Sequence, residues 1–338
     1  MDPVHCLQRI AYLLERDRAE TYKVRAFRGA AAAITGIPVE ELSTMLTARL
    51  QDIPHIGKTS AQVIKEAVSG RMPAYLEKLE AGGLPPMSAE ASRLRAKLRG
   101  DCHSHSDWSD GGSPIREMAL AALELGHEYW TLTDHSPRLT IAHGLDAKRL
   151  REQLDLVAEL NAELAPFRIL TGIEVDILED GSLDQEETLL AQLDVVVASA
   201  HSKLRMDSLA MTDRLLRAVE SPHTDILGHC TGRIIVGRGR PQSIFDADAV
   251  FEACARTGTA VEINSRPERL DPPAELLELA LSLGCDVAID TDAHAPGQLE
   301  WQVYGCEKAA QAQIPAGRIV NTRPIDELLA WTSSHSSN

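Results

Sequence analysis

The hydrophobic pattern divides this chain into a helical front part and a part in which strands and helices alternate. Over its first 80 residues apolar positions recur at intervals of three and four, as in Leu7, Ile10 and Leu14, which is the spacing of amphipathic helices. A Gly-Gly-Leu-Pro-Pro stretch then indicates a linker. We therefore expect a small all-α domain at residues 1–82 and a linker at residues 83–98.

From residue 99 onwards, short β-branched runs alternate with helical stretches. Six of these runs are predicted strands, at residues 129–133, 168–175, 194–198, 225–228, 259–263 and 286–289. A short strand leading into Asp101–His103 brings the number to seven. Regular alternation favours a parallel sheet, and seven units suggest a closed barrel. The expected fold class is α/β, with a seven-stranded (β/α)7 barrel at residues 99–330 and a frayed polar tail at residues 331–338.

Composition narrows the classes of function. Aromatic residues make up only 4% of the chain, which argues against stacking platforms for single-stranded nucleic acid. The net charge is −16, yet the first 100 residues carry 15 Lys and Arg against 11 Asp and Glu, so the basic front part could meet a polyanion. We expect neither a membrane span nor a secretion signal, because no run of 18 apolar residues occurs. Six scattered cysteines indicate free thiols in a reducing cytoplasm.

Nine side chains with metal-binding chemistry follow the predicted strands, where barrels of this kind carry their active sites. They are His103, His105, Asp110, His135, Glu174, His201, His229, Asp292 and His294. A single histidine is more often structural than a ligand, but nine such residues at successive strand ends are not independent accidents. Imidazole and carboxylate groups suit zinc, manganese or iron. Nine ligands exceed the needs of one ion, so we expect two or three divalent ions, with Glu174 as a bridge.

The motifs around these residues resemble, in order, those of the PHP family, the polymerase and histidinol phosphatase domains. The matching segments are Asp101–Gly111, Thr133–Ser136, Gly172–Glu174, Ala200–Ser202, Gly228–His229 and Asp290–His294. The resemblance implies a distorted seven-stranded barrel with a trinuclear metal centre that hydrolyses phosphoesters. Cys230 departs from the family, whose nearest members have proline there. It is either a neutral replacement or a soft atom beside the third ion.

The resemblance also implies how the ligands are shared among the ions. One ion would be held by His103, His105, Glu174 and Asp292, a second by Asp110, His135 and His294, and a third by Glu174, His201 and His229. Of these residues, Glu174, Asp292 and His229 are the expected catalytic ones. Arg233 and Arg269 are the favoured phosphate-binding residues, with Lys203 and Arg266 as further candidates. For each cation alone, a solvated surface charge is an equal alternative.

The front domain resembles the small N-terminal domain of family-X DNA polymerases, with a helix-hairpin-helix around Gly57, Lys58 and Thr59. A helix N-terminus at this point would offer free N–H groups to a DNA phosphate. Gly-Lys-Thr is not a P-loop here, because Asp52 replaces the required first glycine. His55 replaces a glycine of the hairpin, and Val63 replaces the lysine of lyase-active relatives, so we expect no lyase activity. A cap that only shapes the active-site entrance is the alternative to DNA binding.

Three functions follow from these features. The first is a metal-dependent hydrolase of phosphoester bonds at DNA ends, a 3′-to-5′ exonuclease or 3′-end-processing enzyme of DNA repair that uses a metal-activated hydroxide. The second is a small-molecule phosphomonoesterase of the histidinol-phosphatase type. The third is a non-catalytic DNA-binding adaptor, which is disfavoured because no ligand motif is missing. Polymerase activity is excluded, since too few residues separate the two domains to hold a polymerase palm.

Overall fold

The structure is a computed structural model that describes residues 1–335. It separates into two compact units, which we call the helical unit and the sheet unit. The helical unit comprises residues 1–86 together with 296–298, and the rest of the chain forms the sheet unit. The predicted linker contains a helix, α7 (Ala89–Arg95), which belongs to the sheet unit. No helix within the described residues is long and apolar enough to cross a membrane.

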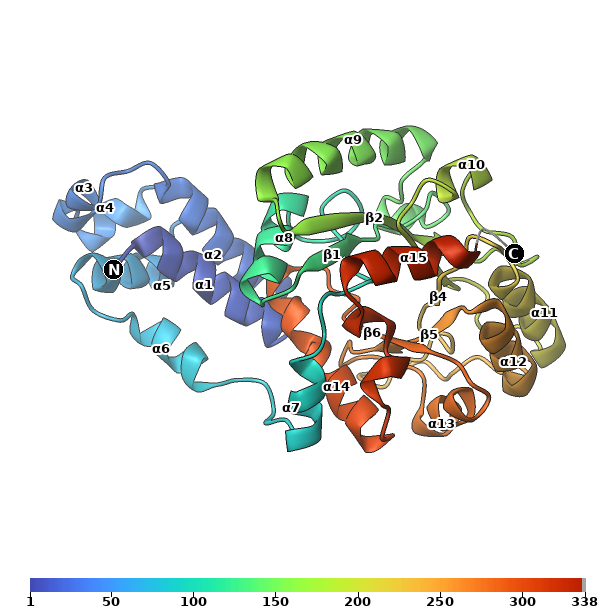
Figure 1. Cartoon of the computed structure of the whole chain (residues 1–338). Coiled ribbons are helices and arrows are strands. Elements are labelled where there is room, and N and C mark those ends of the chain that lie inside the picture. The colour runs from blue at the N-terminus through green and yellow to red at the C-terminus, as the bar shows by residue number, and fades with distance from the viewer. Residues whose placement is uncertain (336–338) are drawn as a thin grey trace. The chain divides into compact units, whose positions relative to one another are not determined.

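The helical unit consists of short helices around one apolar core, as predicted (Figure 1). They are α1 (Pro3–Arg16), α2 (Thr21–Ile34), α3 (Val39–Thr44), α4 (Thr47–Gln51), α5 (Lys58–Val68) and α6 (Ala74–Ala81). Leu7, Ile10 and Leu14 are all buried, which confirms the helical periodicity. Each such side chain contributes about 1.5–3 kcal/mol when it leaves water.

The sheet unit is built on six parallel strands in the order β1 to β6, with helices packed around them (Figure 1). The strands are β1 (Tyr129–Leu132), β2 (Arg168–Asp176), β3 (Val195–Ser199), β4 (Ile226–Leu227), β5 (Ala260–Asn264) and β6 (Val287–Asp290). The helices are α8 (Ile115–Glu124), α9 (Ala147–Leu164), α10 (Glu187–Leu190), α11 (Ser208–Val219), α12 (Ala247–Thr257), α13 (Ala274–Ser282), α14 (Gln302–Gln311) and α15 (Ile325–His335). Nearly every strand residue is buried, as expected for a parallel sheet covered by helices.

The prediction of a seven-stranded closed barrel is wrong, because the described residues form a curled half-barrel of six strands. The segment expected as the seventh strand lies between β1 and β6 without pairing regularly with either. The Thr131 amide donates to the Asp101 carbonyl at 2.9 Å on one side, and the Asp292 amide donates to the His103 carbonyl at 2.9 Å on the other.

Side chains explain why this segment is irregular. The Cys102 amide donates to the Asp290 carboxylate at 2.8 Å, and the Ser104 amide donates to the Thr133 hydroxyl at 2.9 Å. Donors that would form a strand ladder are thus taken by side-chain acceptors. The α/β class is confirmed, while the number of strands is corrected.

The expected frayed tail is also corrected in part. Helix α15 continues to His335, whose Nδ1 lies 2.7 Å from the buried Asp225 carboxylate. Leu328 on the same helix is fully buried, so an apolar contact and a polar contact both hold this helix on the sheet unit. Residues 336–338 lie outside the described residues.

Candidate metal centre

All nine predicted ligands of the sheet unit converge at the carboxyl ends of the strands. Glu174 lies within β2, and His135, His201 and His229 follow β1, β3 and β4. Asp292 and His294 follow β6. His103, His105 and Asp110 come from the irregular segment and the loop after it. Parallel strands place their carboxyl ends at one edge, which explains how residues almost 200 positions apart come to share one site.

Glu174 is the centre of the cluster. Its Oε2 lies 3.4 Å from His103 Nε2 and 3.6 Å from His105 Nε2. Its Oε1 lies 3.1 Å from His201 Nε2 and 2.9 Å from His229 Nε2. The two oxygens of one carboxylate therefore face different sets of imidazoles, which is the arrangement of a bridging ligand.

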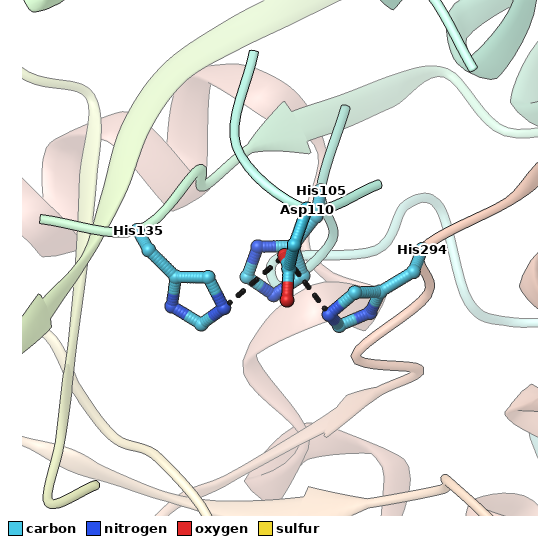
Figure 2. Close-up of side chains that lie close together, drawn as sticks. All are labelled: His105, Asp110, His135 and His294. Carbon is cyan, nitrogen blue, oxygen red and sulfur yellow. Dashed lines mark ion pairs between the residues drawn. The ribbon is translucent and has the colours of Figure 1, made fainter. Parts of the chain in front are cut away.

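A second group surrounds Asp110 (Figure 2). The Asp110 Oδ1 atom lies 3.4 Å from His135 Nε2 and 3.3 Å from His294 Nε2. His105 faces the same point, and one ligand atom from each of the four residues lies within 4.8 Å of all the others. These four side chains come from three separate parts of the sequence.

Three groups in the described residues have the spacing of ligands around an ion. They are His103, His105 and Glu174; His105, Asp110, His135 and His294; and His135, Glu174 and His201. Compared with the expected sharing, His105 also joins the second group and His135 also joins the third. Asp292 and His229 stand beside these groups, with Asp292 Oδ1 3.5 Å from His105 Nε2 and His229 Nε2 2.9 Å from Glu174 Oε1.

Unpartnered nitrogen atoms show that the cluster fits divalent ions. His103 Nε2 and both ring nitrogens of His105 are buried and have no hydrogen-bond partner among the described residues. Two ligands on one tetrahedral zinc ion, each about 2.1 Å from it, are about 3.4 Å apart. The separations of Glu174 from His103 and His105 match that value and exceed a normal hydrogen bond.

The electrostatics of the cluster differ from one side chain to the next. Burial and the neighbouring His294 and His135 hold the pKa of His105 well below its usual value, so its ring is neutral and able to bind a metal. Burial opposes ionisation of Glu174, but His201, His103 and the other rings hold the pKa of its carboxyl well below its usual value. Two other rings differ: although burial lowers their pKa values, Glu262 and Glu174 raise the pKa of His103 well above its usual value, and Glu174 raises that of His201 to about 9. Binding of a metal ion by these two rings therefore requires the release of a proton.

Sequence reasoning missed two polar residues on β5, a strand that provides no ligand. Glu262 Oε1 lies 2.5 Å from His103 Nδ1, and its Oε2 accepts the His229 amide at 2.5 Å. Asn264, two residues on and on the same face, donates to Glu262 at 3.1 Å and to Asp292 at 3.2 Å. Polar residues at i and i+2 in a buried apolar strand were the available signal.

A second missed carboxylate orients His201. Asp176 lies two residues after Glu174 on β2 and is buried. Its Oδ1 accepts the His201 amide at 3.0 Å and lies 3.4 Å from His201 Nδ1. The Nε2 atom of His201 is thereby directed towards Glu174, as in metal sites where a carboxylate holds the other face of a histidine ligand.

The four predicted phosphate-binding cations occupy different places. Arg266 and Arg269 line a pocket of about 320 Å³ together with the metal-binding residues, whereas Arg233 and Lys203 are not part of its lining. Arg233 donates from Nε to the Arg269 carbonyl at 3.0 Å and from Nη2 to the Leu270 carbonyl. Lys203 is exposed, with its Nζ 3.9 Å from Glu179. Of the four predicted cations, only Arg266 and Arg269 thus line the pocket, and phosphate binding by any of the four stays a prediction.

Cys230 is a packing residue. Its side chain belongs to the main apolar core of the sheet unit, and burial raises the pKa of its thiol well above the usual value. Its Sγ atom lies 3.9 Å from the Asp271 carboxylate. This environment agrees with the first of the two interpretations of Cys230, a neutral replacement of proline.

The predicted DNA-binding residues lie at the start of α5 in the helical unit. Gly57 precedes the helix, and its amide donates to the Ser60 hydroxyl at 2.9 Å. Lys58 and Thr59 are exposed in the first turn. His55 has a φ of +68°, the left-handed conformation that favours the glycine it replaces. Val63 is buried in the apolar core, so this position offers no amine.

Comparisons with known proteins support the predicted family resemblance of both parts of the chain. Residues 2–71 match the helix-hairpin-helix domain family, and residues 101–202 match the PHP domain family. The DNA polymerase/3′-5′ exonuclease PolX of Bacillus subtilis is 40% identical over 235 residues, which cover 70% of this chain but only 41% of that protein. A probable phosphatase of Thermoanaerobacter sp. (strain X514) is 30% identical over 59% of this chain and 80% of its own length.

A solved structure gives a weaker match. The histidinol phosphate phosphatase of Lactococcus lactis, crystallised with zinc, L-histidinol and phosphate, aligns with a TM-score of 0.46 at 20% identity. The alignment covers 65% of this chain and 94% of that one.

A buried His and carboxylate cluster at the ends of parallel strands, in a chain with these relatives, defines a metal-dependent hydrolase of phosphoester bonds. The chain belongs to the PHP family, and it carries a helix-hairpin-helix domain in front of the PHP domain.

Proposed function

We propose that this protein hydrolyses phosphoester bonds at DNA ends, as a 3′-to-5′ exonuclease or a 3′-end-processing enzyme of DNA repair. The position of Glu174 between two sets of imidazoles carries the proposal, because it supports a centre of two or three zinc, manganese or iron ions. Similarity to the PolX exonuclease and the helix-hairpin-helix domain favour DNA as the substrate.

The proposed ligands follow the sharing implied by the family resemblance, with Glu174 common to the first and third ions. When bound, the ions lower the pKa of an attacking water molecule and neutralise charge on the phosphoryl oxygens. Arg266 and Arg269 line the same pocket and can orient those oxygens through charged hydrogen bonds. Asp292 lies 3.2 Å from Arg269 Nε, so it holds this guanidinium beside the cluster.

Cleavage of a 5′-labelled DNA duplex with added manganese tests the proposal. The wild-type chain is expected to shorten the labelled strand stepwise from its 3′ end, and His103→Ala is expected to abolish shortening. Lys148→Ala, a change at an exposed position on α9, serves as the control and should retain activity. Shortening that persists in His103→Ala would reveal a contaminating nuclease and remove the support for this function.

The helical unit is proposed to bind the DNA backbone through the start of α5. Lys58→Glu places a negative charge at this helix N-terminus, where it should repel a phosphate and weaken DNA binding several-fold. Lys23→Glu, which changes the net charge equally at an exposed position on α2, is the matched control. Equal loss of binding in both variants would indicate a nonspecific effect of charge, and no loss in either would favour a cap without DNA contact.

A small-molecule phosphomonoesterase is the second candidate. It is favoured by the probable phosphatases, since this chain covers 80% of the length of one of them. Turnover of histidinol phosphate without any DNA product would establish this alternative and exclude the first.

A further inference from the structure

Two aliphatic side chains interrupt the otherwise ionisable lining of the metal pocket. Of the 12 residues that line it, ten are Asp, Glu, His or Arg, and the other two are Leu139 and Ile234. Leu139 belongs to the loop after β1 and Ile234 to the loop after β4, so they enter from strands three places apart in the sheet. Neither can bind an ion or a phosphate, which leaves a non-phosphate part of the substrate as their partner.

The same two loops carry further apolar side chains into solvent. Ile141 is 88% exposed two residues after Leu139, while Ile235 and Val236, directly after Ile234, are 50% and 39% exposed. Each of the two loops thus carries exposed aliphatic side chains close in sequence to the one that lines the pocket.

Both loops have a defined backbone conformation, one through hydrogen bonds and the other through a close approach at a glycine. Ile234 and Arg240 exchange two main-chain hydrogen bonds, of 2.9 and 2.8 Å, and the Ile235 amide donates to the Glu268 carbonyl at 2.8 Å. In the other loop, a Cβ atom at Gly144 would lie 1.8 Å from the Ser136 carbonyl oxygen, so the close approach there requires glycine. The two aliphatic side chains are thus presented by ordered turns.

We propose that Leu139 and Ile234 form a subsite for the nucleobase of the terminal nucleotide whose phosphoester is cleaved. This inference rests on the proposed function at DNA ends. A nucleobase has two flat faces that apolar side chains can contact, and its edges can stay in water, so the subsite accepts any base. No Phe, Tyr or Trp among the described residues lines the pocket. A short polar phosphomonoester would leave the two aliphatic side chains in solvent.

The experiment compares two 5′-labelled DNA duplexes that differ only in the 3′-terminal residue of the labelled strand, which is a thymidine or an abasic tetrahydrofuran nucleotide. The wild-type chain should cleave the base-bearing end about tenfold better in kcat/KM, the effect of one base contact of modest strength. The Leu139→Ala/Ile234→Ala double variant should bring this ratio close to one, mainly through KM. Ile244→Ala changes an exposed aliphatic residue outside the pocket lining and should keep the wild-type ratio.

Each outcome decides between the two proposals. Equal cleavage of both ends by the wild type, or a ratio unchanged in the double variant, would overturn the nucleobase subsite and leave the DNA-end function standing. Absence of DNA cleavage by a wild-type chain that turns over a small phosphoester would overturn both. If circular dichroism shows the double variant to be misfolded, Ile234→Thr, which keeps the branch at Cβ but replaces the ethyl group by a hydroxyl group, must lower the ratio by itself.

Discussion

The Nδ1 atom of His103 lies 2.5 Å from Oε1 of Glu262, and both side chains are completely buried. This contact fixes the orientation of the imidazole, so that Nε2 faces Glu174. Because the other Glu262 oxygen accepts the His229 amide, one carboxylate holds two segments of the cluster. Strand β5 thereby orients two ligand-bearing segments through the Glu262 side chain, although β5 itself provides no ligand.

Glu262→Gln should weaken metal binding. The amide has a single acceptor oxygen, so its NH2 group would face either the His103 ring or the His229 amide and disrupt one of the two contacts. Loss of such a partner typically lowers metal affinity about 10- to 100-fold. Metal content after dialysis against graded chelator concentrations measures the effect, and Glu163→Gln on the exposed face of α9 is the control. Wild-type metal retention by Glu262→Gln would contradict this role.

Removal of metal should lower the thermal stability of the chain. Ions that bind only the folded state stabilise it by about 4 kcal/mol at a thousandfold excess over Kd, which corresponds to several degrees in Tm. The Tm measured in EDTA should therefore be several degrees lower than the Tm measured after manganese is restored. His105→Ala removes a residue shared by two ligand groups, so its melting temperature should respond less to the chelator. A Tm that is the same with and without chelator would argue against a metal centre in the folded chain.

Residue spacing predicted those parts of the structure that depend on local pattern. The periodicity of Leu7, Ile10 and Leu14 predicted the helical unit, and strand ends predicted the convergence around Glu174. Spacing could not show that the segment around Asp101 would be held by side-chain acceptors in place of a strand ladder.

Contacts between distant residues were equally invisible in the sequence. Arg233 follows a strand end just as Arg269 does, and only the folded chain shows that Arg233 donates to main-chain carbonyl groups. Glu262 is likewise an isolated acidic residue in the sequence, and its role depends on a histidine 159 positions away. The type and local position of a residue could be predicted, but not its partner.

Arg269 and Arg233 should respond differently to substitution by Met. Arg269 Nη1 is buried beside the pocket without a hydrogen-bond partner among the described residues, so Arg269→Met should raise KM about tenfold or more by removing a phosphate contact. Arg233→Met removes the donor of the Arg269 carbonyl, while the Leu270 carbonyl keeps its hydrogen bond from Lys308, so the change should chiefly lower stability, by about 1–3 kcal/mol. Steady-state kinetics and thermal melts on both variants test this division. A kinetic defect in Arg233→Met at unchanged Tm would restore Arg233 as a phosphate ligand.

His127 should make the stability of the sheet unit depend on pH, at a position outside the metal cluster. Burial and the neighbouring Arg95 lower the pKa of His127 from 6.5 to about 3. The unfolded chain therefore takes up a proton as the pH falls below 6.5, whereas the folded chain does not until about pH 3, so stability is present above pH 6.5 and is lost between these values. At pH 5 the loss should be about 2 kcal/mol.

His127→Gln cannot bind this proton and should lack that part of the pH dependence. Urea unfolding in EDTA at pH 7.5 and pH 5.0 measures it, with the chelator removing any contribution from metal binding. The stability difference between the wild type and His127→Gln should shift by about 2 kcal/mol in favour of the variant at the lower pH. His143→Gln, at an exposed histidine, is the matched control and should follow the wild type. An equal shift in both variants would mean that the buried His127 ring is protonated in the folded chain at pH 5.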